Sequence, residues 1–293
     1  MGLFSFFVKS GNVYFPGGMT YYKHRDIYEL YQKIFYKLGI GFNVLDEFVS
    51  CGIEAMESGY ENEARKLARK NFSLIKDNGF HGIITTSPEC YKMFLKHYPD
   101  IIFDWNISVL NTWGLILREL QRKPRLIKNP AMEEVCFQDN CYLGRGCGIY
   151  EEPRRILEVL GYEIVELHNS YEDSLCCGSC GGLTRTNLEL ANKIAREKIL
   201  QVKRLGVKKL IVNSVENYDL LKKNEGELGV EVLELSGVLA EALEIQRVKF
   251  EKDEEVMGEE DIYLEAKANE KLIEELEEED LSDEMEDLED DRL

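Results

Sequence analysis

Apolar positions in the first half of the chain form two kinds of segment, short continuous runs and longer amphipathic stretches. The runs at 11–15, 42–46 and 82–86 are rich in β-branched and aromatic residues and predict strands. The stretches at 27–39 and 63–79 carry apolar residues at helical spacing and end at glycine, as helix C-termini often do. Strands that alternate with helices predict a mainly parallel sheet with helices on both faces.

The same order of segments returns in the second half. Runs at 133–138, 163–167 and 209–213 predict strands, and amphipathic stretches at 151–161 and 187–206 predict helices that again close at glycine. The second half therefore predicts a second α/β unit.

Matching spacings indicate that the two units are repeats of one another. "VYF" at 13–15 corresponds to "VCF" at 135–137, and each phenylalanine is followed 13 residues later by tyrosine and 24 residues later by glycine. "SCG" at 50–52 then corresponds to "CCG" at 176–178. Such self-similarity predicts two tandem related α/β units, residues 1–125 and 126–250.

The charge of the protein is concentrated in residues 251–293, which carry 22 acidic and 4 basic side chains and leave 33 acidic and 32 basic in the rest of the chain. We expect this acidic tail to be disordered or to form a docking helix. Because acidic side chains repel phosphate, nucleic acid is not an expected partner.

The ends and the hydropathy of the sequence bear on its location. The first residues lack a basic leader and a long apolar run, so we expect no signal peptide, and no apolar run approaches the length of a membrane span. Eight cysteines without a secretion signal are typical of a reducing compartment. We therefore predict a cytoplasmic protein without a membrane span.

Cysteines gather in the second unit, at "LCCGSCGG" (175–182), which contains Cys176, Cys177 and Cys180. Cys141 lies on the loop after the first strand of the same unit, with Cys147 a turn beyond it. Loops at the carboxyl ends of parallel strands meet at one edge of the sheet. Thiolates that converge among glycines fit a thiolate metal site or an iron-sulfur cluster.

Other interpretations of these thiols remain open. Buried cysteines can pack as small hydrophobic residues, and Cys177 with Cys180 has the Cys-x-x-Cys spacing of a redox dithiol. Adjacent Cys176 and Cys177 could pair as a disulfide only with strain. Arg145 and Arg154 could neutralise a bound anion or simply be solvated.

Specific motifs resemble the cysteine-rich CCG domains of the heterodisulfide reductase B/D family. They are "DNCYLGRGCGIYEEPRRILEVLG", "EDSLCCGSCGG" and "NSVENY". The family motif is Cys, a spacer, Cys-Cys-Gly, a second spacer and Cys-x-x-Cys, usually in two copies. Here 34 residues separate Cys141 from Cys176, and 36 separate Cys177 from Ser214. In the first copy, 31 residues separate Gly18 from Ser50, and 35 separate Cys51 from Ser87.

The resemblance implies an electron-transfer protein whose CCG motifs hold iron-sulfur clusters, but both motifs are incomplete. Gly18, Ser50 and Ser87 stand at cysteine positions of the first copy, which keeps Cys51 and Cys90. In the second copy, Ser214 and Asn217 replace the terminal Cys-x-x-Cys.

Cys180 is an additional cysteine that restores a fourth thiolate to the second copy. Our hypothesis is a single remodelled [4Fe-4S] cluster held by Cys141, Cys176, Cys177 and Cys180, in a heterodisulfide reductase-like component that works with other subunits of a redox complex. The alternative is a non-catalytic, zinc-binding or metal-free relative that acts through protein partners. The roles of Cys51, Cys90 and Cys147 stay open.

Overall fold

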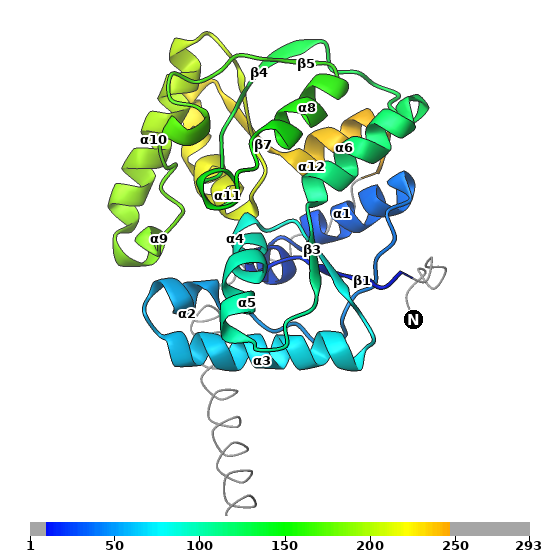
Figure 1. Ribbon diagram of the computed structural model, residues 1–293. Coiled ribbons are helices and arrows are strands. Elements are labelled where there is room, and N and C mark those ends of the chain that lie inside the picture. The colour runs from blue at the N-terminus through cyan, green and yellow to red at the C-terminus, as the bar shows by residue number, and fades with distance from the viewer. Residues whose placement is uncertain (1–9, 247–293) are drawn as a thin grey trace, which may run out of the picture.

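The computed structural model describes residues 10–246, which form two α/β halves with helices packed between them (Figure 1). The first half contains, in order, β1 (Asn12–Phe15), the π-helix η1 (Met19–Lys23), α1 (Arg25–Leu38), α2 (Ile53–Glu57), α3 (Glu61–Asp77), β2 (Gly82–Thr85), α4 (Pro88–Lys92), the π-helix η2 (Met93–His97), α5 (Tyr98–Ile101), β3 (Ser108–Leu110), α6 (Thr112–Arg122) and the 3-10 helix η3 (Pro124–Leu126).

The second half repeats this succession of strands and helices. It contains β4 (Glu133–Phe137), α7 (Gly144–Cys147), α8 (Glu151–Val159), β5 (Tyr162–Ile164), the 3-10 helix η4 (Tyr171–Asp173), α9 (Leu183–Thr186), α10 (Leu188–Arg204), β6 (Lys209–Val212), α11 (Val215–Glu225), the 3-10 helix η5 (Gly226–Leu228), β7 (Glu231–Glu234) and α12 (Leu235–Ala242).

Both sheets are parallel and share one topology. The second sheet has the order β5-β4-β6-β7, and the first has β1-β2-β3. In the first half, a single parallel bridge between Val13 and Asn43 occupies the place that β5 takes in the second. The predicted α/β class with two related parallel units is thereby confirmed.

Helices from the two halves pack against each other in a reciprocal way. The last helix of the first half, α6, packs on α8 of the second, and α12, the last helix of the second half, packs on α1 of the first. Figure 1 shows these helices together on one side of the molecule. Their apolar faces form one core from both halves, which includes Phe35, Trp113, Leu157 and Leu239. Each such side chain stabilises the fold by about 1.5–3 kcal/mol through burial.

Most predicted elements are present, and one prediction is wrong. The segment 42–46 does not form a strand, because only Asn43 pairs with its neighbour and the chain then leaves the sheet edge. Asn43 holds this point with backbone bonds to Asn12 and Tyr14 and with side-chain bonds to the carbonyls of Ser10 and Asn12. Helix α1 ends at Gly39 in the left-handed conformation, as the sequence predicted.

Within residues 10–246, no helix combines the length and the apolar character that a membrane crossing requires. The predictions about the acidic tail and the first residues of the chain concern segments outside the described residues.

Candidate functional site

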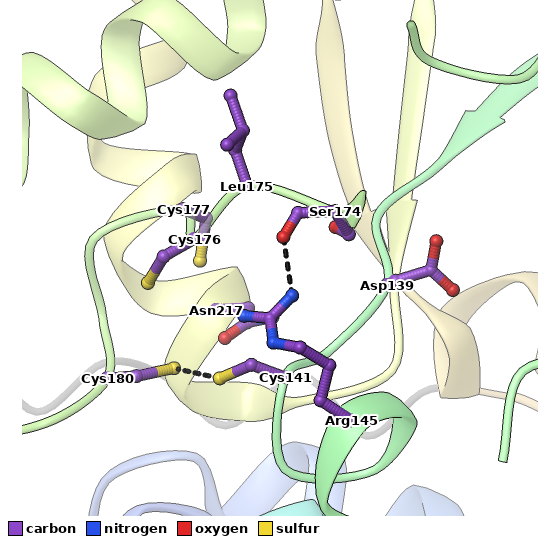
Figure 2. Close-up of a pocket in the computed structure, with 9 residues that line it drawn as sticks. All are labelled: Asp139, Cys141, Arg145, Ser174, Leu175, Cys176, Cys177, Cys180 and Asn217. Atoms are coloured by element: carbon purple, nitrogen blue, oxygen red, sulfur yellow. Dashed lines mark hydrogen bonds between the residues drawn. The ribbon is translucent and has the colours of Figure 1, made fainter. Parts of the chain in front are cut away.

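The four predicted cysteines come together at the carboxyl edge of the second sheet. Cys141 follows β4, and Cys176, Cys177 and Cys180 lie on the loop between η4 and α9. Figure 2 shows their side chains around one pocket, which Asn217 of α11 also lines. The convergence expected from strand order is present, whereas their role as metal ligands stays a prediction.

The thiols are close enough to interact directly. The sulfurs of Cys141 and Cys180 are 3.2 Å apart. Hydrogen bonds from the thiols of Cys141, Cys177 and Cys180 lower the pKa of Cys176 far below its usual value. The hydrogen bond with Cys176 is in turn the largest cause that raises the pKa of Cys141 to about 11. The four groups therefore favour a shared negative charge centred on Cys176, the most exposed of them.

Glycine at position 178 allows the cysteine loop to lie against helix α10. Gly178 has φ +100°, and a Cβ there would lie 2.7 Å from the carbonyl oxygen of Ala191. Its backbone N–H donates to the sulfur of Cys176 at 3.3 Å. A side chain at 178 would therefore push the loop away from the helix and disturb Cys176 and Cys177.

Polar side chains fix the end of the loop. Ser179 Oγ donates to Asn217 Oδ1 at 2.7 Å and lies 3.4 Å from the sulfur of Cys177. Asn217 stands at a position where the heterodisulfide reductase B/D family has cysteine. Its side-chain amide holds the cysteine loop in place through Ser179. Ser214 accepts a hydrogen bond from the N–H of Asn217 and caps α11, as Ser87 caps α4 in the first half.

A buried ion cluster holds the loop that precedes the cysteines. The guanidinium of Arg154 binds both carboxylate oxygens of Asp139, at 2.6 and 2.8 Å, and also binds Glu166. It lies 3.8 Å from the ring centroid of Tyr171, whose N–H donates to Asp139. Arg154 therefore supports the backbone rather than facing solvent.

Arg145 reaches the same loop from α7. Its guanidinium donates to the carbonyl oxygens of Ser174 and Glu172, and it lines the pocket of the four cysteines (Figure 2). Arg145 therefore lies beside the four cysteines, and its role in neutralising a bound anion stays a prediction.

A cleft of about 460 Å³ opens beside the four thiols, between the two halves of the protein. Glu57 and Lys92 line it from the first half, and Cys141, Tyr142 and Cys180 from the second. Tyr142 OH donates to Glu57 at 2.6 Å, and Lys92 forms an ion pair with the same carboxylate at 3.0 Å. A molecule in this cleft would reach the sulfurs of Cys141 and Cys180.

The first half contains two thiols at related positions. Cys51 and Cys90 are buried, and their sulfurs are 2.8 Å apart. Burial is the largest cause that raises the pKa of Cys90 well above its usual value, and the hydrogen bond with the Cys51 thiol raises it further. These two residues lie in a cluster of aromatic and aliphatic side chains. They therefore differ from the second-half thiols, of which Cys176 is exposed.

The remaining cysteines are not members of the four-thiol group. Cys136 is fully buried in β4, and Cys147 is half-buried at the end of α7 against the shared core. Burial raises the pKa of Cys136 to about 12, so its thiol stays protonated at neutral pH.

Sequence reasoning missed Lys198, which lies in α10 behind the cysteine loop. Lys198 is 2% exposed, and its Nζ has no hydrogen-bond partner among the described residues. Its burial could have been predicted from its position, because Lys198 lies on the apolar stripe of the helix that also contains Ala191, Ala195 and Val202.

The donor set fits an iron-sulfur group in its chemistry. Four thiols meet among glycines, and the buried Lys198, whose Nζ has no hydrogen-bond partner within residues 10–246, lies on α10 behind them. Around a single tetrahedral ion, metal-sulfur distances of about 2.3 Å place the sulfurs about 3.8 Å apart, and in a [4Fe-4S] cluster they lie farther apart because each thiolate binds a different iron. Cys141 and Cys180 must therefore separate to take up metal, and no three His, Cys, Asp or Glu side chains within residues 10–246 already have single-ion spacing.

Comparison with protein families identifies both halves. The model of the CCG cysteine-rich domain matches residues 13–95 and again 135–216, which is more than half of the chain. The chain belongs to the CCG cysteine-rich domain family. One match falls in each half and covers the strands β1 and β2 or β4, β5 and β6, while β3 and β7 lie outside the matched ranges.

Curated relatives of this CCG protein are redox proteins by name. It is 30% identical over 219 residues to "Probable iron-sulfur-binding oxidoreductase FadF" of Bacillus subtilis, across 73% of this chain and 30% of the relative. It is 27% identical to a subunit of the dihydromethanophenazine:CoB--CoM heterodisulfide reductase of Methanosarcina acetivorans, across 65% and 48%. It is 26% identical to a subunit of the fumarate reductase (CoM/CoB) of Methanothermobacter marburgensis, across 68% and 39%.

The CCG protein thus spans less than half the length of each of these relatives. The name of the Bacillus subtilis relative includes iron-sulfur binding, and the other two relatives are named as reductase subunits.

Proposed function

We propose that this CCG protein is an iron-sulfur electron-transfer component of an oxidoreductase, with one [4Fe-4S] cluster held by Cys141, Cys176, Cys177 and Cys180. The observation that carries the proposal is the convergence of these four thiols on one pocket, where the sulfurs of Cys141 and Cys180 are 3.2 Å apart. Such a cluster is held by four cysteine thiolates and supplies one-electron oxidation and reduction when bound.

The chain would prepare the ligands and control access to them. Gly178 permits the close approach of the loop to α10, and Asn217 holds Ser179 between two of the cysteines. Arg154 and Arg145 fix the loop on its other side. These contacts reduce the reorganisation that ligand binding requires, as supporting interactions around metal ligands commonly do.

Electrons would enter or leave where the site opens. Cys176 is exposed, and Cys141 and Cys180 border the cleft between the halves. An exposed ligand suits transfer to a protein partner, so we propose that the chain works with other subunits of a redox complex in the cytoplasm. The relatives named as subunits support this arrangement.

Cys180 provides the test of this assignment, because it restores the fourth thiolate. The full chain is purified anaerobically, and its iron, acid-labile sulfide and visible absorbance are measured for the wild type, Cys180→Ala and Cys147→Ala. We expect Cys180→Ala to lose or alter the cluster and Cys147→Ala to resemble the wild type.

Two outcomes would contradict the proposal. A colourless wild type that contains zinc would support a structural metal site instead. Equal iron and sulfide contents in the wild type and Cys180→Ala would exclude Cys180 as a ligand.

A further inference from the structure

Lys198 is a charged residue in a place where charge is unfavourable. It occupies the buried stripe of α10, and its Nζ lacks a hydrogen-bond partner among residues 10–246. An isolated ammonium in an apolar interior is strongly destabilised unless a negative group compensates for it. A buried lysine therefore either loses its proton or lies near a negative group that keeps it charged.

The cysteine loop is the feature that faces this part of α10. Gly178 lies against Ala191, and Cys177 shares an apolar cluster with Ala195 and Ile199. Burial lowers the pKa of Lys198, and the charges of Cys177, Cys176 and Asp139 counteract this shift. Because Arg154 already binds both oxygens of Asp139, the group of four cysteines is the negative partner left to balance Lys198.

The first half offers an internal comparison at the equivalent position. Asn71 in α3 and Lys198 in α10 each lie eight residues before the glycine that follows the helix, Gly79 or Gly206. Asn71 is neutral, and its Nδ2 donates to the carbonyl oxygen of Ser50 at 2.8 Å. Ser50 occupies the position of Cys176. The cation is thus present in the half that has the cysteine pair and absent in the half that lost it.

We infer that Lys198 is the buried countercharge of the group bound by the four cysteines. It is thereby a positioning residue that raises the reduction potential of that group. This inference rests on the proposed function. A fixed positive charge favours the state with one more electron, and it also favours the deprotonated ligands that metal requires.

The test compares Lys198→Met and Lys198→Asn with the wild-type full chain, purified anaerobically. Lys198→Asn copies the first half, and Lys198→Met keeps the length of the side chain without its charge. We expect both variants to show a more negative reduction potential in a redox titration. We also expect both variants to lose iron to a chelator about tenfold faster. A tenfold change corresponds to the loss of a charge interaction equivalent to one pKa unit.

A matched control separates this effect from the loss of any lysine on α10. Lys193 lies on the same helix, is exposed and forms an ion pair with Glu189. Lys193→Met should leave the potential and the iron retention unchanged. Metal-free Lys198→Met should unfold at the same or a higher urea concentration than the wild type, because an apolar side chain replaces a buried cation.

The outcomes distinguish this inference from the proposed function. A cluster with the same potential in Lys198→Met and the wild type would overturn the role of Lys198 and leave the cluster assignment intact. A wild type without iron and sulfide would overturn the assignment itself, and with it the countercharge.

Discussion

At the residue scale, Gly178 and Gly181 provide a controlled comparison on one loop. Both have positive φ, but only Gly178 approaches a neighbour, since nothing lies within 4 Å of a Cβ at Gly181. Gly181→Ala should therefore lower stability by about 1 kcal/mol through backbone strain alone. Gly178→Ala should lower it further and reduce iron content. Urea unfolding and iron analysis check both, and equal effects would show that contact with α10 is unimportant.

Arg154 permits a second prediction on the cysteine loop. Arg154→Met leaves Asp139 buried without its partner, so the free energy of unfolding should fall by about 3–5 kcal/mol. Arg204 pairs with Glu197 on the surface, and Arg204→Met should change stability by less than about 1 kcal/mol. Chemical denaturation of both variants measures the difference. A similar small loss for both would mean that the buried ion cluster does not support the fold.

The site residues that could be predicted from the sequence are those whose residue type itself indicates the chemistry, namely the cysteines. Four cysteines at strand ends suffice to indicate a thiolate site, and the structure brings them together. The supporting residues were not predictable in the same way. Lys198 resembles an ordinary helix lysine until its burial is known, and the bond from Ser179 to Asn217 joins residues 38 positions apart.

At the scale of elements, η1 and α11 join the two halves through Asp219. Its carboxylate contacts Lys23 at 3.0 Å, His24 at 3.1 Å and Lys223 at 2.8 Å. Although burial acts to raise the pKa of Asp219, hydrogen bonds from His24, Lys223 and Lys23 hold it well below its usual value. The ionised carboxylate therefore stabilises the folded state.

The sign of the resulting pH dependence follows from this lowered pKa. The stabilisation is complete above the unfolded pKa of about 4 and is lost as pH falls towards the lower folded pKa. Asp219→Asn should lower the free energy of unfolding by about 1–2 kcal/mol at pH 7, because solvent screens part of the attraction. The difference from the wild type should shrink below about pH 4. Urea unfolding between pH 3 and pH 7 checks this, and a difference independent of pH would contradict it.

Some elements were predictable and others were not. Helices α3 and α10 and strands β2 and β6 follow directly from apolar spacing and terminal glycines. Strands β3 and β7 were not predicted. Strand β3 has only three residues, and β7 leads directly into α12, so no break in the sequence separates the two elements. The reciprocal packing of α6 and α12 depends on which faces meet in three dimensions, and local spacing does not encode it.

At the scale of the whole molecule, the two halves share a fold but differ in the chemistry that they support. The first half keeps the close buried thiols Cys51 and Cys90, and the second holds four thiols of which one is exposed. Cys90→Ala should therefore leave the iron content unchanged and lower stability by about 1 kcal/mol. Iron analysis and denaturation of this variant check the expectation, and a loss of iron would place a ligand in the first half.

We propose one cluster per chain, held by the second half. The stoichiometry of iron and acid-labile sulfide per full chain is measured after anaerobic purification, together with electron paramagnetic resonance. One [4Fe-4S] cluster corresponds to about four iron and about four sulfide per chain. About twice that content, or zinc without sulfide, would contradict this proposal.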